Sequence, residues 1–195
     1  VVAIGLDSSS AMARRGHDGP VDVRVFVSGA PGTGKTTVAA ELARQLEVPM
    51  LSLDVIKEAL GDSLGLGDQS WSDRVGDAAA EVLFQLAASF PSAIAEGWWR
   101  RERRERAMSE FAGWVEVFCR CDPEVAALRM RARAADARHR IHRDVINPAI
   151  LDGVADAVAS TTPLRVKGGS LVEVDTTVGG DESATISAIR AVLGM

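Results

Sequence analysis

The sequence lacks several features that would each point to a particular class of protein. It has 2 cysteines, no long apolar run and no excess of basic residues. Its apolar runs fall short of the roughly 18–20 residues that a membrane-spanning helix needs, so the sequence predicts no membrane protein. A net charge of −5 argues against a protein that coats nucleic acid by bulk electrostatics, although a local basic groove stays compatible with it.

The two cysteines, Cys119 and Cys121, form a C-x-C pair. This spacing is neither a redox C-x-x-C nor half of a zinc site with a partner pair. Within a strand both thiols would lie on one face. We therefore expect buried, unreactive thiols and a reducing, cytoplasmic compartment.

The chain length and composition suit one α/β domain. With 195 residues, 47% hydrophobic and 25% charged, it has the balance of a core-forming protein. We expect residues 1–20 to form a flexible leader and residues 21–195 to form the domain. Strand and helix patterns alternate five times, with expected strands at residues 21–28, 50–53, 92–95, 114–119 and 171–174. This alternation predicts a three-layer sandwich: a five-stranded parallel sheet with helices on both faces.

Apolar spacing and helix-breaking residues place the helices. One helix should open at Lys35, and another at Asp54 ahead of a Gly- and Ser-rich loop over residues 61–70. Pro123 fits the first turn of a later helix, where its missing N–H is not needed. A longer amphipathic helix is marked by Val75, Ala79, Val82, Leu86 and Phe90.

A complete G-x-x-x-x-G-K-T motif at residues 29–36 is the strongest signal in the chain. It follows a valine-rich strand and opens an amphipathic helix, the context in which such a loop cradles phosphates. Lys35 should reach the β- and γ-phosphates of ATP, and the Thr36 hydroxyl should bind Mg²⁺. The residues expected to bind the nucleotide are Gly29, Ala30, Pro31, Gly32, Thr33, Gly34, Lys35, Thr36 and Thr37.

The motifs that are missing narrow the choice among nucleotide-binding proteins. The chain has no N-K-x-D tetrapeptide of the kind that binds guanine in GTPases. Its third expected strand ends in Ala-Ile-Ala-Glu-Gly, without the Asp-Glu pair of AAA-type or transporter ATPases. It is also too short for a helical lid domain after the core. These absences favour a phosphotransferase.

Charged residues suggest how such an enzyme would work. Asp54 follows the second expected strand, where it can accept the proton of an acceptor hydroxyl, unless it only caps the next helix. Lys57 lies one turn further and can hold an anionic group. Arg129 and Arg133 share one helix face and can neutralise phosphate charge. An arginine-rich stretch near residues 134–147 suggests a lid.

The acceptor should lie near the end of the third expected strand. The segment from Glu96 to Arg100 should line the cleft there. Glu96 can hold a Mg²⁺-bound water or a substrate hydroxyl, and Trp98 and Trp99 can stack on a base, sugar or drug ring. We expect at least one of Trp98 and Trp99 to be packed under the next helix. Glutamates interrupt the basic run at residues 100–106, which favours a solvated helix with pairs three and four residues apart.

Taken together, these motifs resemble those of small P-loop kinases that are often named AAA-type ATPases. Chloramphenicol phosphotransferases, zeta toxins and polynucleotide 5′-kinases are relatives of that group. The resemblance implies a strand order of 2-3-1-4-5 and a general-base role for Asp54. At the position of Lys57 the polynucleotide branch has arginine, and lysine cannot make the same bidentate contact.

We therefore expect an ATP- and Mg²⁺-dependent phosphotransferase that passes the γ-phosphate directly to a hydroxyl of a small molecule. Lys35, Asp54, Arg129 and Arg133 are the expected catalytic residues, and Lys57, Glu96, Trp98 and Arg100 the expected substrate-binding residues. Two alternatives stay open: a polynucleotide 5′-hydroxyl kinase, and a nucleotide-binding switch or slow ATPase. The sequence does not indicate which acceptor is used or the oligomeric state.

Overall fold

A single six-stranded sheet organises the protein. The computed structural model describes residues 2–5, 22–99, 101–135, 140–142, 149–178 and 182–195. The strands are β1 (Val2–Gly5), β2 (Arg24–Ser28), β3 (Met50–Ser52), β4 (Ala93–Gly97), β5 (Val115–Arg120) and β6 (Ser170–Asp175), in the sheet order β1-β6-β5-β2-β4-β3. The strands β2 to β6 are parallel. If these five strands are numbered 1 to 5 along the chain, starting at β2, their order across the sheet is 2-3-1-4-5. The predicted α/β fold, sheet and strand order are confirmed.

The strand β1 lies outside that prediction. It pairs antiparallel with β6, with Val2 opposite Val174 and Gly5 opposite Leu171. The expectation of a flexible leader over residues 1–20 therefore does not hold for residues 2–5, while residues 6–20 lie outside the described part of the chain. The short apolar run at the start of the sequence serves as an edge strand.

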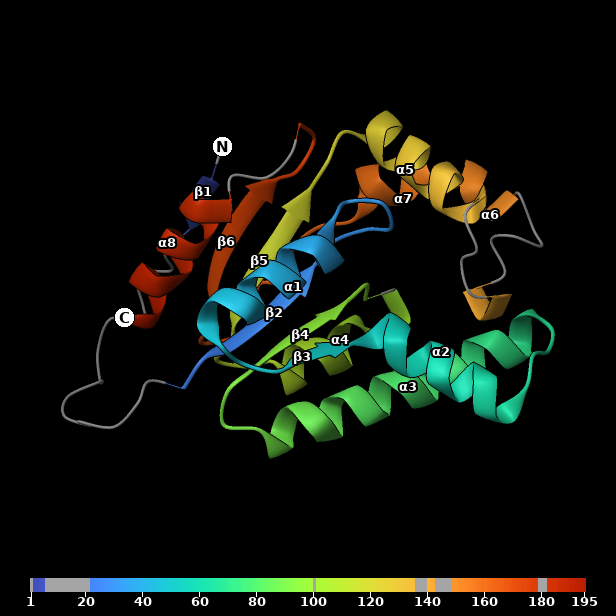
Figure 1. Ribbon diagram of the computed structural model, residues 1–195, viewed down its shortest axis with the longest axis horizontal. Coiled ribbons are helices and arrows are strands. Elements are labelled where there is room, and N and C mark those ends of the chain that lie inside the picture. Colours follow the sequence, from blue (N-terminus) through green and yellow to red (C-terminus); the bar gives the residue numbers. More distant parts are fainter. Residues whose placement is uncertain (1, 6–21, 100, 136–139, 143–148, 179–181) are drawn as a thin grey trace.

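Helices cover both faces of the sheet (Figure 1). The covering helices are α1 (Lys35–Leu46), α3 (Gln69–Ser89), α4 (Arg101–Glu110) and α8 (Glu182–Leu193). The side chains of β2 alternate: Val25 and Val27 pack with α1 and α8, whereas Phe26 packs with α3 and α4. This is the burial pattern of a central strand with helices on either side.

The other helices lie nearer the expected site. α2 (Leu53–Leu64) begins one residue earlier than predicted and includes part of the expected loop, which is reduced to residues 65–68. α5 (Pro123–Ala135) begins at the proline, as predicted. α5 and α7 (Val154–Ser160) pack together, and η1 (Arg140–His142) and α6 (Ala149–Asp152) lie between them in the sequence. Most of the expected lid near residues 134–147 lies outside the described residues.

Helix α3 buries a different face from the one predicted. Val75 and Ala79 are buried, but Val82 and Leu86 are partly exposed, and Phe90 follows the end of the helix. The contacts with the sheet and α4 are made instead by Ala80, Leu83, Phe84 and Ala87. The helix is apolar over a wide arc, so spacing alone could not identify the buried side.

The cysteines are buried, as predicted. Both thiols are free, and burial raises the pKa of the Cys119 thiol to about 12. A thiol with such a pKa is an unreactive nucleophile at neutral pH. Among the described residues, no helix is long and apolar enough to cross a membrane.

Candidate active site

The phosphate loop joins β2 to α1 and depends on three glycines with positive φ. These angles are 151° at Gly29, 80° at Gly32 and 76° at Gly34, where L side chains are strained. A Cβ on Gly32 would also overlap the carbonyl oxygen of Ala126 in α5. The loop therefore needs glycine at position 32 for two reasons, its backbone conformation and its close contact with α5.

Two threonines hold the loop in shape. The Thr33 hydroxyl donates to the Ala30 carbonyl at 2.8 Å, within the loop itself. The Thr176 hydroxyl donates to the Thr33 carbonyl at 2.7 Å, from just beyond the end of β6. The loop is thus fixed both locally and by the last strand of the sheet. No sequence motif pointed to this role of Thr176.

Glu96 lies beneath the loop at the centre of a buried polar cluster. Its Oε1 accepts a hydrogen bond from the Thr36 hydroxyl at 3.2 Å and lies 3.5 Å from the Lys35 ammonium. Its Oε2 accepts from the Ser52 hydroxyl at 2.8 Å. Glu96 is only 1% exposed. The structure therefore groups Glu96 with the phosphate loop, and Glu96 does not line the pocket that holds Asp54, Lys57 and Trp98.

A cavity of about 600 Å³ opens beside the loop and the start of α1. Arg129 of α5 lines it and donates to the carbonyls of Thr176 and Thr177 at 2.8 and 3.2 Å. Arg133, one turn further along α5, also lines it and is exposed. The predicted pair thus shares one cavity, with Arg129 anchored to backbone oxygens and Arg133 accessible. The wall also includes Gly32, Gly34, Lys35, Thr36, Thr37 and Val38.

The remaining predicted loop residues lie around this cavity. Pro31 lines the pocket that also holds Asp54 and Lys57, and Ala30 and Thr33 line another cavity, of about 610 Å³, near the ends of β5 and β6. Gly29 lies at the first turn of the loop, where a Cβ would crowd Cys119 beneath it.

A second pocket, of about 250 Å³, adjoins the loop on the side of α2 and α3. We refer to it as the acceptor pocket, after the acceptor expected there from the sequence, and to the cavity of about 600 Å³ as the nucleotide cavity. Asp54, Lys57 and Trp98 line it, and Lys35 and Arg133 belong to both this pocket and the nucleotide cavity. The structure therefore brings the predicted base, the phosphate-loop lysine and an arginine to adjoining cavities.

Asp54 is not the cap of helix α2. The cap is Ser52, whose hydroxyl accepts from the Val55 N–H at 3.5 Å. Asp54 is the second residue of the helix and is half-buried at the pocket. The alternative that Asp54 serves only as a helix cap is therefore wrong. Ser52, which caps the helix and also bonds Glu96, was missed by the sequence analysis, although its position at the end of a strand could have suggested it.

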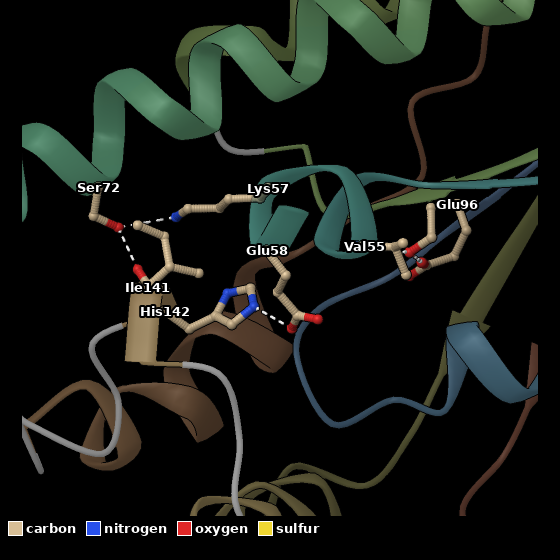
Figure 2. A network of polar contacts seen from close by, with 8 residues as sticks. Val55, Lys57, Glu58, Ser72, Glu96, Ile141 and His142 are labelled. Atoms are coloured by element: carbon tan, nitrogen blue, oxygen red, sulfur yellow. Dashed lines mark hydrogen bonds and ion pairs between the residues drawn. The ribbon is translucent and has the colours of Figure 1, made fainter. Parts of the chain in front are cut away.

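A network of polar contacts joins α2, α3 and η1 at the pocket (Figure 2). The Lys57 ammonium donates to the Ser72 hydroxyl at 3.0 Å, and that hydroxyl donates to the Ile141 carbonyl at 2.7 Å. The His142 ring lies 2.7 Å from Glu58, which faces it from α2. Ile141 is only 1% exposed, so η1 packs against the protein as well as forming hydrogen bonds with α2 and α3.

The two adjacent tryptophans have different surroundings. Trp99 is buried and stacks on Phe84 at a centroid distance of 5.3 Å, so the expectation that at least one tryptophan is packed in the core is confirmed. Trp98 is partly exposed and lines the acceptor pocket. Arg100 lies outside the described residues.

The basic run that follows differs from its predicted role as a merely solvated helix. Arg106 does pair with Glu110 four residues on, but it also reaches Glu81 of α3. Arg104 donates to the carbonyls of residues 162 and 163. Arg103 pairs with Asp77 of α3 and lines the acceptor pocket. Arg103 is thus a candidate functional residue. It could not be singled out from the sequence, because it is one of several arginines in the same run.

Known kinases are similar to this chain in sequence. A cytidylate kinase from Pyrobaculum arsenaticum is 28% identical over 132 residues, which cover 63% of this chain and 67% of that protein. A second cytidylate kinase, from Pyrobaculum neutrophilum, is 50% identical over 44 residues, and this match covers 23% of this chain and 24% of that protein.

Solved structures share the whole architecture. A candidate kinase from Chloroflexus aurantiacus is 33% identical with a TM-score of 0.76, over 89% of this chain and 99% of that one. A shikimate kinase from Acinetobacter baumannii has the same fold at 17% identity, with a TM-score of 0.61 over 89% of this chain and 95% of that one. The fold is that of a P-loop kinase, which implies ATP binding. The AAA domain family model matches residues 25–149, and the chain belongs to this family.

Proposed function

We propose that the protein transfers the γ-phosphate of ATP, with Mg²⁺, to a hydroxyl group of a small molecule. The observation that carries the proposal is the junction of the two cavities: Lys35 and Arg133 line both, and Asp54 lines the acceptor pocket. An acceptor there would lie beside the nucleotide phosphates. Such an arrangement permits direct in-line transfer, which depends on positioning and charge stabilisation.

The nucleotide side of the reaction rests on the loop and α5. Loop N–H groups and the positive end of α1 favour phosphate oxygens, and Lys35 adds a full charge. Arg129 and Arg133 line the same cavity and can neutralise charge that develops on the transferring group. Because Arg129 is held by two backbone carbonyls, its guanidinium is already placed before the nucleotide binds.

The donor set under the loop fits Mg²⁺. Thr36 and Ser52 provide hydroxyls and Glu96 a carboxylate, the hard oxygen groups that this ion prefers. Thr36 would bind the ion directly, and Ser52 and Glu96 would hold its waters. When bound, Mg²⁺ supplies positive charge that neutralises the phosphates. Among the described residues no cluster of His, Cys, Asp and Glu side chains offers a different metal site.

Asp54 would act on the acceptor as a general base. Its carboxylate can accept the proton of a hydroxyl while the oxygen attacks the γ-phosphate, a contribution of about 10²–10⁴-fold. Trp98 offers an aromatic surface in the same pocket. The volume of about 250 Å³ is near the lower end of the range for small-molecule sites, which favours a small acceptor over a polynucleotide.

The test is transfer of labelled γ-phosphate to pooled nucleosides, sugars, antibiotics and 5′-hydroxyl oligonucleotides. Asp54→Asn should reduce transfer by about 10²–10⁴-fold and leave ATP affinity unchanged. Asp62→Asn is a matched control, because Asp62 is exposed on the same helix. Label released only as free phosphate, equally by the variant and the unchanged protein, would contradict the proposal and favour a switch or slow ATPase.

A second candidate is a kinase whose acceptor is a nucleotide phosphate, which the similarity to cytidylate kinases favours. A phosphate acceptor is already deprotonated near neutral pH, so it needs no general base. Transfer to cytidylate that survives Asp54→Asn would support this candidate. Transfer to a hydroxyl compound that is lost in the same variant would support the first.

We infer from the motifs that chloramphenicol phosphotransferases, zeta toxins and polynucleotide 5′-kinases are relatives of this chain. We likewise propose a cytoplasmic location, which the buried free thiols support.

A further inference from the structure

Two cationic side chains flank one point in the wall of the acceptor pocket. That point is Gly76 of α3, where a Cβ would lie 3.1 Å from Nη2 of Arg103 and 3.6 Å from the Lys57 ammonium. Lys57 comes from α2 and Arg103 from α4, and both line the pocket. The absence of a side chain at Gly76 therefore leaves room for two cations to approach the same place.

Fixed partners orient both cations. Arg103 donates through Nε to Asp77 at 2.6 Å and through Nη2 to the Asp73 carbonyl at 3.3 Å. Lys57 donates to the Ser72 hydroxyl, which is itself bonded to η1 (Figure 2). These bonds restrict rotamers that a ligand would otherwise have to order, so the two groups are largely preorganised.

The charged side chains on the walls of the pocket favour an anion. The walls carry Lys35, Lys57, Arg103 and Arg133, against the carboxylates of Asp54 and Asp73, while Asp77 and Glu96 pair with Arg103 and Lys35 from outside the walls. Lys35 and Arg133 also face the nucleotide cavity, where phosphates would engage them. Lys57 and Arg103 line only the acceptor pocket, and a guanidinium beside an ammonium suits carboxylate or phosphate oxygens.

We infer that Lys57 and Arg103 form an anion subsite, so that the acceptor is a hydroxyl compound that also carries a carboxylate or a phosphate. This inference rests on the proposed function and names the class of its substrate. Lys57 lies one turn after Asp54 on α2, so an anionic group held by Lys57 and Arg103 leaves the rest of the molecule close to Asp54. The subsite thus both selects the acceptor and orients its hydroxyl.

The test measures binding of matched pairs of compounds by ligand-observed NMR, with the protein saturated by Mg²⁺ and a non-hydrolysable ATP analogue. The carboxylate pairs are shikimate with its methyl ester and gluconate with gluconamide. The phosphate pair is glycerol 3-phosphate with glycerol. We expect an acid to bind about tenfold or more tightly than its neutral partner, since the neutral partner lacks the charge-assisted hydrogen bonds to the two cations. The pair that shows the preference identifies carboxylate or phosphate as the anion.

Three variants test whether Lys57 and Arg103 cause the preference for acids over neutral compounds. Arg103→Gln and Lys57→Gln should each remove most of it. Gly76→Ala keeps both charges but should weaken the preference by displacing the Arg103 guanidinium, the flexible end of a side chain. Arg106→Gln is the matched control, because Arg106 also joins α4 to a carboxylate on α3 but does not line the pocket.

Opposite results would overturn the subsite. An unchanged protein that binds no acid better than its neutral partner refutes it, as does a preference that survives both Arg103→Gln and Lys57→Gln. Phosphate transfer to a neutral hydroxyl compound, without any preference for acids, would refute the subsite and retain the kinase. Acid-selective binding without transfer to any compound would retain the subsite and refute the proposed function.

Discussion

Replacement of Glu96 by glutamine would test how the buried cluster supports both folding and nucleotide binding. At 3.5 Å, with an effective dielectric constant of about 20, the attraction between Glu96 and Lys35 amounts to about 5 kcal/mol. Desolvation of both groups offsets part of that attraction. The relevant comparison is the loss of one partner from a buried pair, which costs about 3–5 kcal/mol. Glu96→Gln should lower the unfolding free energy of the nucleotide-free protein by that amount.

Nucleotide should restore much of this loss. Phosphate oxygens provide Lys35 with a new partner, and the negative charge of Glu96 no longer repels them. In EDTA, the variant should therefore bind ATP at least as tightly as the unchanged protein, and gain more stability from it. Added Mg²⁺ should strengthen binding less in the variant, since the carboxylate that would hold its waters is gone. Urea unfolding with and without ATP, in EDTA or Mg²⁺, measures all of these effects.

A second buried glutamate provides the control. Glu116 is fully buried, but its partners are the Ser28 hydroxyl and the N–H groups of Leu164 and Arg165. Glu116→Gln should destabilise the protein to a similar degree whether or not nucleotide is present. The reasoning about Glu96 would be refuted if Glu96→Gln left the nucleotide-free stability unchanged, or if it weakened ATP binding in EDTA.

Three other variants test single features. Gly32→Ala should abolish ATP binding in a titration, because its Cβ would overlap the Ala126 carbonyl. Gly113→Ala has a similar positive φ but an open site, so this variant should bind ATP normally and lose only about 1–2 kcal/mol of unfolding free energy. Burial raises the pKa of Glu116, so the contribution of this group to stability is complete below its unfolded pKa of about 4.5 and falls as the pH rises. The unfolding free energy that Glu116→Gln loses relative to the unchanged protein should therefore shrink from pH 4.5 to 8 in urea titrations. Arg129→Met should slow phosphate transfer by about 10³-fold or more without unfolding the protein; unchanged kcat would exclude a role in charge stabilisation.

The sequence predicts the parallel fold and the phosphate loop well, because both depend on local patterns. Strand, glycine turn and helix follow one another at residues 24–46, and Asp54 lies two residues after the end of β3. Such patterns do not predict the strand β1, since an edge strand of four residues has little periodicity of its own.

Other parts of the site depend on the approach of distant segments. Arg103 enters the acceptor pocket only because α4 packs against α3 near Gly76. Within the sequence it is one of several arginines in a basic run, and its neighbours Arg104 and Arg106 have structural partners. Ser52 likewise resembles an ordinary helix cap until β3 and β4 bring it to Glu96. Such roles arise from tertiary contacts and leave no local pattern.

The hydrogen bond from Thr176 to Thr33 has a consequence for the order of events during synthesis. It joins residues 143 positions apart, so the phosphate loop leaves the ribosome long before the strand that fixes it. β6 lies beside β5, and the loop cannot gain this support until β6 has paired. A growing chain that ends before residue 176 should therefore bind ATP poorly despite an intact motif. The ability to bind nucleotide would then arise late in synthesis and nearly in one step, when β6 joins the sheet.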